Sequence, residues 1–132
     1  MKRAAAATLS GVFGASMLLA SCATIGPTWS ELSGARYYNR TILDRRPLII
    51  ERVDGESTPV RVPIKIAPGR HEITVSSLRH GEFRGGILSQ LTLDIEPCKR
   101  YYINAQYPDP VQPRYTPVVD YVEPISGCRP GA

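Results

Sequence analysis

Three cysteines and two histidines are the side chains of this 132-residue chain best suited to chemistry: Cys22, Cys98, Cys128, His71 and His80. Thiolates and imidazoles bind metals, and both act in catalysis. Neither histidine has a second His, Cys or carboxylate at a spacing typical of a metal site. No Gly-x-Ser-x-Gly elbow supports a serine hydrolase. The sequence therefore predicts no metal, no cofactor and no enzymatic activity.

The first cysteine ends the run Leu19-Ala20-Ser21-Cys22, which follows a basic start and an apolar stretch over residues 4–20. This order resembles the signal peptide and lipobox of bacterial lipoproteins. The resemblance implies cleavage that removes residues 1–21 and acylation of Cys22. One alternative is a membrane-spanning helix, which needs about 20 mostly apolar residues without such polar interruptions. Another is an ordinary secretory signal followed by a chance cysteine.

The resemblance also implies a location. Ala23, rather than aspartate, follows the cysteine, which in this pattern favours the outer membrane. We expect a lipid-anchored, periplasm-facing protein, because two or three acyl chains give durable attachment. Gly26-Pro27 breaks any helix, so residues 22–36 are predicted as a lipidated N-terminus and flexible tether, with the folded domain at residues 37–132.

Acylation of Cys22 leaves Cys98 and Cys128 as an even pair in an oxidising compartment. We predict a disulfide between them that pins the C-terminal segment to the end of a strand. Two free thiols are the alternative. A disulfide would also remove Cys98 from any catalytic pair with His71.

The charge of the chain argues against nucleic acid as a partner. The formal net charge of +4 falls by two when Lys2 and Arg3 leave with the signal, and no basic run exceeds a pair. No nucleic-acid partner is expected.

Apolar and polar residues alternate with a period of two along most of the mature chain, which is typical of half-buried strands. Turn residues separate these segments. We predict an all-β fold, a small antiparallel β-sandwich of Ig-like or transthyretin-like type with six or seven strands. The strands are expected at residues 48–53, 60–66, 72–76, 91–96, 100–106 and 118–122, with 37–42 as the seventh. Asp54-Gly55 is predicted to end a strand in a turn, and Pro68-Gly69 to form a tight hairpin.

The residues Val53-Asp54-Gly55 and the run from Val62 to Val75, with its Pro68-Gly69 turn and His71-x-Ile73-x-Val75 strand, resemble PEGA-type surface-layer modules. The match covers about a quarter of the mature chain, and its motifs are structural. The chain departs from the pattern after Val75. The resemblance implies a binding or structural module without catalytic residues.

Two loops are candidates for binding. Phe83 lies in a glycine-rich connection, and Tyr107, Arg114 and Tyr115 belong to a proline-rich segment. Exposed tyrosine beside arginine suits protein or glycan contacts. The alternatives are a flexible hairpin loop and a solvated crossover between two sheets.

These observations favour a non-enzymatic, lipid-anchored binding or scaffold module in the periplasm, with an envelope protein or glycan as partner. The alternative is a small envelope enzyme, or an inhibitor of one, that acts on peptidoglycan or peptides.

Overall fold

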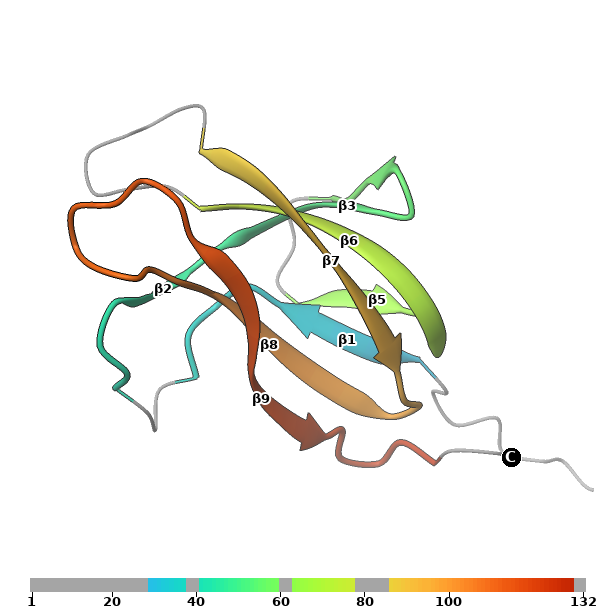
Figure 1. Ribbon diagram of the computed structural model, residues 1–132. Helices are drawn as coiled ribbons and strands as arrows, with labels where there is room; N and C mark the ends of the chain where they lie inside the picture. Colours follow the sequence, from blue (N-terminus) through green and yellow to red (C-terminus); the bar gives the residue numbers. More distant parts are fainter. Residues whose placement is uncertain (1–28, 38–40, 60–62, 78–85, 130–132) are drawn as a thin grey trace, which may run out of the picture.

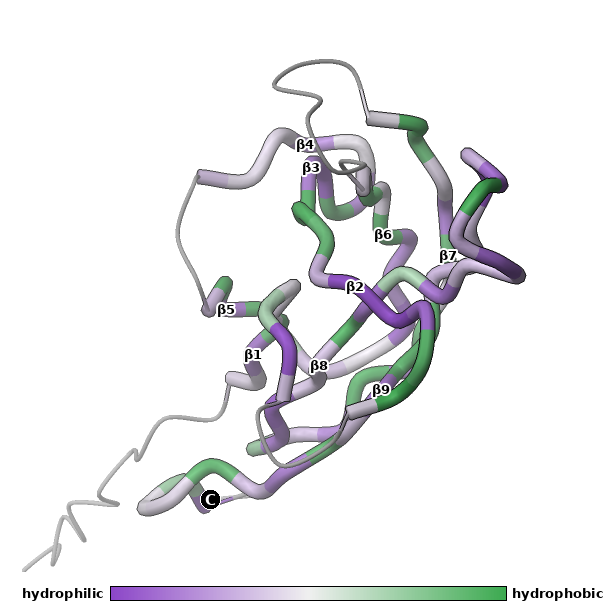
Figure 2. Tube along the Cα trace, turned by 90° about the vertical axis from the view of Figure 1, so that its left-hand side faces the viewer, coloured by the Kyte–Doolittle hydropathy of each residue, from purple (hydrophilic) through white to green (hydrophobic). Residues whose placement is uncertain are grey.

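The computed structural model describes residues 29–37, 41–59, 63–77 and 86–129. These residues form nine strands and no helix. The strands build two sheets that pack face to face (Figure 1). Figure 2 shows the two layers from another side, with β3, β4 and β6 above β1, β5, β8 and β9. The predicted all-β sandwich is therefore confirmed.

The first sheet has β8 at its centre. Its five strands are β1 (Ser30–Ser33), β2 (Arg45–Pro47), β5 (Ile64–Ile66), β8 (Lys99–Gln106) and β9 (Thr116–Pro124). β9 pairs antiparallel along the full length of one edge of β8. The other edge is shared, because β1 pairs parallel with the first half of β8 and β2 pairs antiparallel with the second half. β5 pairs with the outer edge of β1.

The second sheet is antiparallel, with the order β4-β3-β6-β7. Its strands are β3 (Ile49–Val53), β4 (Glu56–Ser57), β6 (Gly69–Ser77) and β7 (Ile87–Ile95). β6 and β7 pair over nine consecutive positions without a bulge. β3 carries an irregularity between Ile50 and Arg52 where it pairs with β6.

The core lies between the sheets and follows from the alternation of the strands. In β8, Tyr101, Ile103 and Ala105 point inward, because side chains two apart share one face of a strand. Leu32, Ile73 and Ile103 are fully buried. The complete cluster is Leu32, Leu48, Ile50, Ile64, Ile66, Ile73, Val75, Ile95, Tyr101, Ile103, Ala105 and Tyr107.

Most predicted strands are confirmed to within a few residues. Segments 48–53, 72–76, 91–96, 100–106 and 118–122 correspond to β3, β6, β7, β8 and β9. The segment 60–66 contains β5, although residues 60–62 lie outside the described residues. The strand count of six or seven was too low, because β1, β2 and β4 are short and were not predicted.

The structure differs from two predictions near the N-terminus, the end of the tether and the strand at 37–42. The tether was predicted to run to residue 36, yet β1 lies inside this range, and its Ser30 and Leu32 are fully buried. The domain therefore starts before residue 37. A strand was predicted at 37–42, of which residues 38–40 lie outside the described residues. The described Tyr37, Thr41 and Ile42 are outside any strand, and β2 begins at Arg45.

The two predicted turns differ in outcome. Asp54 and Gly55 form the turn between β3 and β4, and both have positive φ, 51° and 81°, which is typical of a two-residue hairpin. Pro68-Gly69 does not form a hairpin. β5 pairs with β1 in one sheet and β6 pairs with β3 and β7 in the other, so this turn carries the chain between the layers.

Candidate functional site

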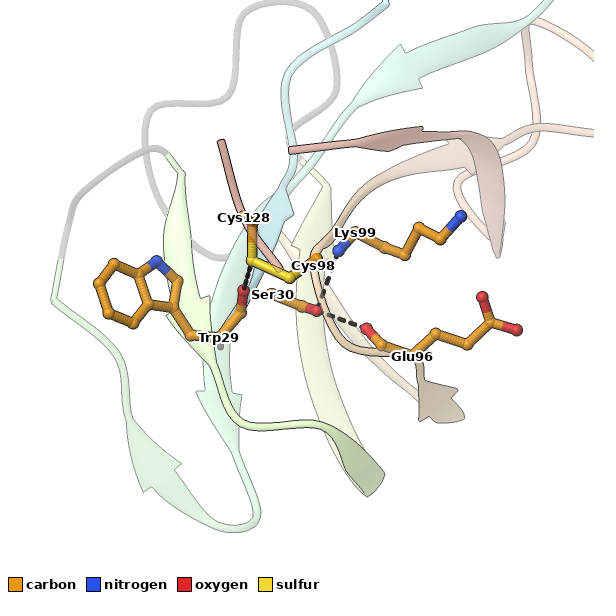
Figure 3. The surroundings of a disulfide bond; sticks show 6 residues. All are labelled: Trp29, Ser30, Glu96, Cys98, Lys99 and Cys128. Carbon is orange, nitrogen blue, oxygen red and sulfur yellow. Dashed lines mark hydrogen bonds between the residues drawn. A yellow bond between two sulfur atoms is a disulfide. The ribbon is translucent and has the colours of Figure 1, made fainter. Parts of the chain in front are cut away.

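Cys98 and Cys128 form a disulfide where β8 begins, with their Cα atoms 5.4 Å apart (Figure 3). The predicted disulfide is confirmed. The chain after β9 also returns here through backbone bonds, because Ile125 N donates to Cys98 O over 2.9 Å and Cys128 N donates to Ile125 O over 3.2 Å. We call this part of the sandwich, which includes Trp29 and Ser30, the disulfide end.

Ser30 connects the start of β1 to the disulfide end. Its side chain is fully buried. Its Oγ donates a hydrogen bond to the carbonyl oxygen of Glu96 and accepts one from Lys99 N over 3.1 Å. The carbonyl oxygen of Trp29 lies 3.8 Å from the sulfur of Cys128. The point where the chain enters the domain is therefore held against the β7–β8 turn and the disulfide (Figure 3).

Trp29 carries the exposed aromatic ring of the disulfide end. Its side chain is 37% exposed. The ammonium nitrogen of Lys65 lies 4.1 Å from the centre of the ring, which is a cation–π contact. Trp29, Lys65, Ile66, Ala67 and Pro68 line an open hollow of about 260 Å³. In Figure 3 the ring points away from the disulfide.

Trp29 was predicted to lie in the tether, and no role was predicted for it. Two features of the sequence could have drawn attention to Trp29 and Lys65. Trp29 is the single tryptophan of the chain, and Lys65 alternates with Ile64 and Ile66, which are buried. The missing information was that β1 pairs antiparallel with β5, which places Trp29 beside Ala67.

The predicted binding surface of the proline-rich segment is wrong for Tyr107. Tyr107 is 4% exposed and belongs to the core, where its hydroxyl bonds to Ser77 Oγ over 2.8 Å. Tyr115 packs against the same core, with its ring centre 5.6 Å from that of Tyr107. Burial raises the pKa of Tyr115 to about 12, because the phenolate would lose hydration. Both rings hold this segment on the sandwich rather than offering it to a partner.

Arg114 and Phe83 are the other two residues of the predicted binding surface. Arg114 is exposed, at the end of the sandwich opposite the disulfide, since β8 runs from one end to the other. Phe83 lies outside the described residues. Among the described residues of the predicted binding surface, Arg114 alone is exposed as expected.

His71 is held in place at both ring nitrogens. Nδ1 lies 2.6 Å from Asp54 Oδ2, and Nε2 lies 2.8 Å from the carbonyl oxygen of Ala67. Asp54 Oδ1 also accepts a hydrogen bond from Glu72 N. The bond from His71 and then the bond from Glu72 lower the pKa of Asp54. These contacts join the β3–β4 turn to β6, and they leave neither nitrogen directed at a substrate.

Charged and aromatic side chains cover the outer face of the five-stranded sheet. Arg100 bonds to Glu31 over 2.6 Å and to Glu123 over 3.0 Å, and these bonds raise its pKa. The hydroxyl of Tyr102 donates to the same Glu123. Since every one of these groups is paired, the network stabilises the sheet and has no polar group directed at a ligand.

Three tyrosines extend this outer face. The ring of Tyr37 stacks on that of Tyr121, with centres 4.1 Å apart, and meets the edge of Tyr102 at 5.2 Å. Tyr101 and Tyr102 point to opposite faces of β8, because neighbouring side chains alternate along a strand: Tyr101 belongs to the core and Tyr102 lies beside Tyr121. Tyr102 is nevertheless 7% exposed, because the ring of Tyr37 packs against it on that face.

Among the described residues, no three His, Cys, Asp or Glu side chains gather as metal ligands would. None of the residues that the structure describes belongs to a helix able to cross a lipid bilayer. No protein family, no curated protein and no solved structure matches the chain.

Proposed function

We propose that this chain is a bacterial envelope lipoprotein, cleaved before Cys22 and held on the outer membrane by acyl chains on that cysteine. The sandwich is then a non-enzymatic binding or scaffold module that faces the periplasm. The location follows the lipobox-like run Leu19-Ala20-Ser21-Cys22 and the residue Ala23 after it.

The observation that carries the proposal is the use of the three cysteines. Cys98 and Cys128 are joined to each other, which leaves Cys22 as the remaining thiol of the chain. A disulfide between strand ends is typical of exported proteins, because the cytosol keeps thiols reduced. The pairing thus supports export, and export is what the apolar stretch before Cys22 would provide.

The proposal of a non-enzymatic role is supported by the hydrogen bonds of His71, the histidine that the structure describes. His71 contacts Asp54 and the carbonyl of Ala67 with its two nitrogens, so its ring acts as a structural link. The resemblance of this region to PEGA modules is structural as well. No described contact favours the alternative of an envelope enzyme or inhibitor.

Metabolic labelling with palmitate tests the anchor. Wild-type protein should take up the label and fractionate with membranes, and Cys22→Ser should lose both properties. The matched control is the double variant Cys98→Ser/Cys128→Ser, which should keep the label because its lipobox is intact. A Cys22→Ser variant that labels like the wild type would overturn the proposal.

Cross-linking in intact cells tests the binding role. A binding or scaffold module should yield one stoichiometric envelope protein or glycan adduct. Peptidoglycan or peptide hydrolysis by the purified protein, abolished by His71→Ala, would favour the enzyme alternative instead.

A further inference from the structure

We propose that the disulfide end of the sandwich docks on the surface of an anionic phospholipid bilayer, with Trp29 at the interface and Lys65 among the headgroups. This inference rests on the proposed acylation of Cys22. It adds that the protein itself, and not the acyl chains alone, contacts the membrane, and that the domain has one fixed orientation.

The length of chain before the domain limits which surface can reach the bilayer. Cys22 lies seven positions before Trp29. Seven residues span at most about 25 Å, and about 15 Å on average when flexible. β8 alone, with eight residues, is about 27 Å long. The disulfide end is therefore kept near the membrane, while the end that carries Arg114 extends away from it.

The exposed groups of the disulfide end suit a membrane interface. An indole ring combines an apolar body with an N–H donor, which is why tryptophan is enriched at the level of lipid headgroups. Trp29 is 37% exposed, and its neighbours Ala67 and Pro68 are exposed as well. The open hollow beside the ring, about 260 Å³ in volume, has room for parts of lipid headgroups or chains.

The charges at this end favour anionic lipid. Lys65, Lys99 and Arg129 are basic, and Glu96 is acidic. Glu31, the strand partner of Lys65, is bonded to Arg100, so these two charges offset one another. Asp54 and Glu56 line a hollow on the other side of Lys65, and Asp54 is bonded to His71. Arg70 and Asp94 also lie at the disulfide end, but they occupy paired positions on β6 and β7 and offset one another. Basic side chains within a Debye length of an anionic surface are attracted to it.

The rigidity of this end makes an oriented contact feasible. Ser30 ties the backbone beside Trp29 to Glu96 and Lys99, and the disulfide holds the segment after β9 to the same point. Little conformational freedom remains to be lost on docking, which is the advantage of a preorganised surface.

The emission of Trp29 tests the proposal directly, because the chain has one tryptophan. The full lipidated protein is reconstituted into vesicles of phosphatidylcholine and phosphatidylglycerol that contain lipids brominated near the headgroup end of the acyl chains. Flotation of the vesicles first establishes that the protein is anchored. Docking should then shift the emission to shorter wavelength, quench it by bromine and protect it from acrylamide in the water.

Charge reversal at each end provides matched variants. Lys65→Glu, on the exposed side of β5, should reduce the docked fraction, with the docking equilibrium constant lowered about fivefold or more. Arg114→Glu, at the opposite end, should leave Trp29 as well quenched as in the wild type. Equal quenching in all three proteins would contradict the role of Lys65.

The outcomes separate the two proposals. A protein that floats with the vesicles but keeps the emission of a water-exposed indole, fully quenched by acrylamide, would overturn docking and leave the anchor intact. A protein that does not float would overturn the anchor and docking together. If the Trp29 emission is not quenched by the brominated lipid but changes when a soluble N-acetylglucosamine oligomer is added, docking is overturned, and a glycan binds at the same hollow instead.

Discussion

Ser30 and Glu96, 66 positions apart, are joined by a hydrogen bond from the hydroxyl of one to the carbonyl oxygen of the other. The same hydroxyl accepts the backbone N–H of Lys99. One small buried side chain therefore satisfies two main-chain groups of the turn that joins the two sheets. Through this contact the first strand of the domain is fastened to the disulfide end.

Ser30→Ala should destabilise the protein by about 1–3 kcal/mol, since it removes the hydrogen-bond partner of two partly buried backbone groups of the turn. Urea unfolding followed by circular dichroism measures the change. Ser126→Ala, at an exposed position of the neighbouring loop, is the control and should stay close to the wild type. If both variants unfold at the wild-type midpoint, the hydroxyl of Ser30 does not hold the turn.

The double variant Cys98→Ser/Cys128→Ser should lose about 3–4 kcal/mol of stability. The bond closes a loop of 30 residues, and its loss frees the unfolded chain to explore more conformations. Wild-type protein unfolded in the presence of a reductant should behave like the double variant. A reductant that leaves the wild-type unfolding curve unchanged would contradict the bond.

Asp54→Asn should reduce the loss of unfolding free energy that the protein undergoes as the pH is lowered. In the folded protein the pKa of Asp54 is lowered, first by the bond with His71 and then by the bond with Glu72. A carboxyl with a depressed folded pKa contributes stability above its unfolded pKa of about 3.9, and this stability is lost as the pH falls through the lowered value. Asparagine also tolerates the positive φ of this position, so the turn is preserved.

The measurement is the melting temperature between about pH 6 and pH 2. The wild type should lose more stability than Asp54→Asn on the way to low pH. Parallel curves for the two proteins would mean that the Asp54–His71 contact contributes nothing to folding.

Tyr115→Phe should destabilise the protein by about 1 kcal/mol, because the hydroxyl contacts the carbonyl oxygens of Val75, at 3.2 Å, and Ile87, at 2.5 Å. It should also remove one tyrosine that ionises near pH 12 from a spectrophotometric titration. Val111→Ala, a 77% exposed position of the same segment, is the control. If the titration of Tyr115→Phe still contains every high-pH ionisation, the assignment of Tyr115 is wrong.

The sandwich could be predicted because its long strands are rich in β-branched and aromatic residues and several of them alternate apolar with polar positions in the sequence. In β7 the apolar Leu91, Leu93 and Ile95 alternate with polar residues, and burial follows this pattern. β8 was predicted from its aromatic content instead, and its five residues from Tyr101 to Ala105 are all buried. β1 could not be recognised in this way. Its one large apolar residue is Leu32, and the buried Ser30 and Ser33 look like loop residues until their partners in other strands are known.

Local sequence patterns could not predict which strands pair with one another. Pro68-Gly69 is a good turn in either arrangement, but a turn signal does not say whether the flanking strands bond to each other or enter different sheets. Here β5 completes the edge beside β1, and β6 joins β3. Likewise, Tyr107 and Tyr115 resemble exposed loop residues in the sequence, and only the long-range packing against Ser77 and Val75 makes them structural.

Mass spectrometry of the N-terminal peptide of the mature protein, isolated from cell membranes, shows whether Cys22 is acylated. An acylated protein yields a peptide that begins at Cys22 and carries the mass of a diacylglyceryl group, with or without an additional acyl chain. A peptide that begins at Met1, or one that begins at or after Cys22 without added lipid mass, would contradict acylation of Cys22.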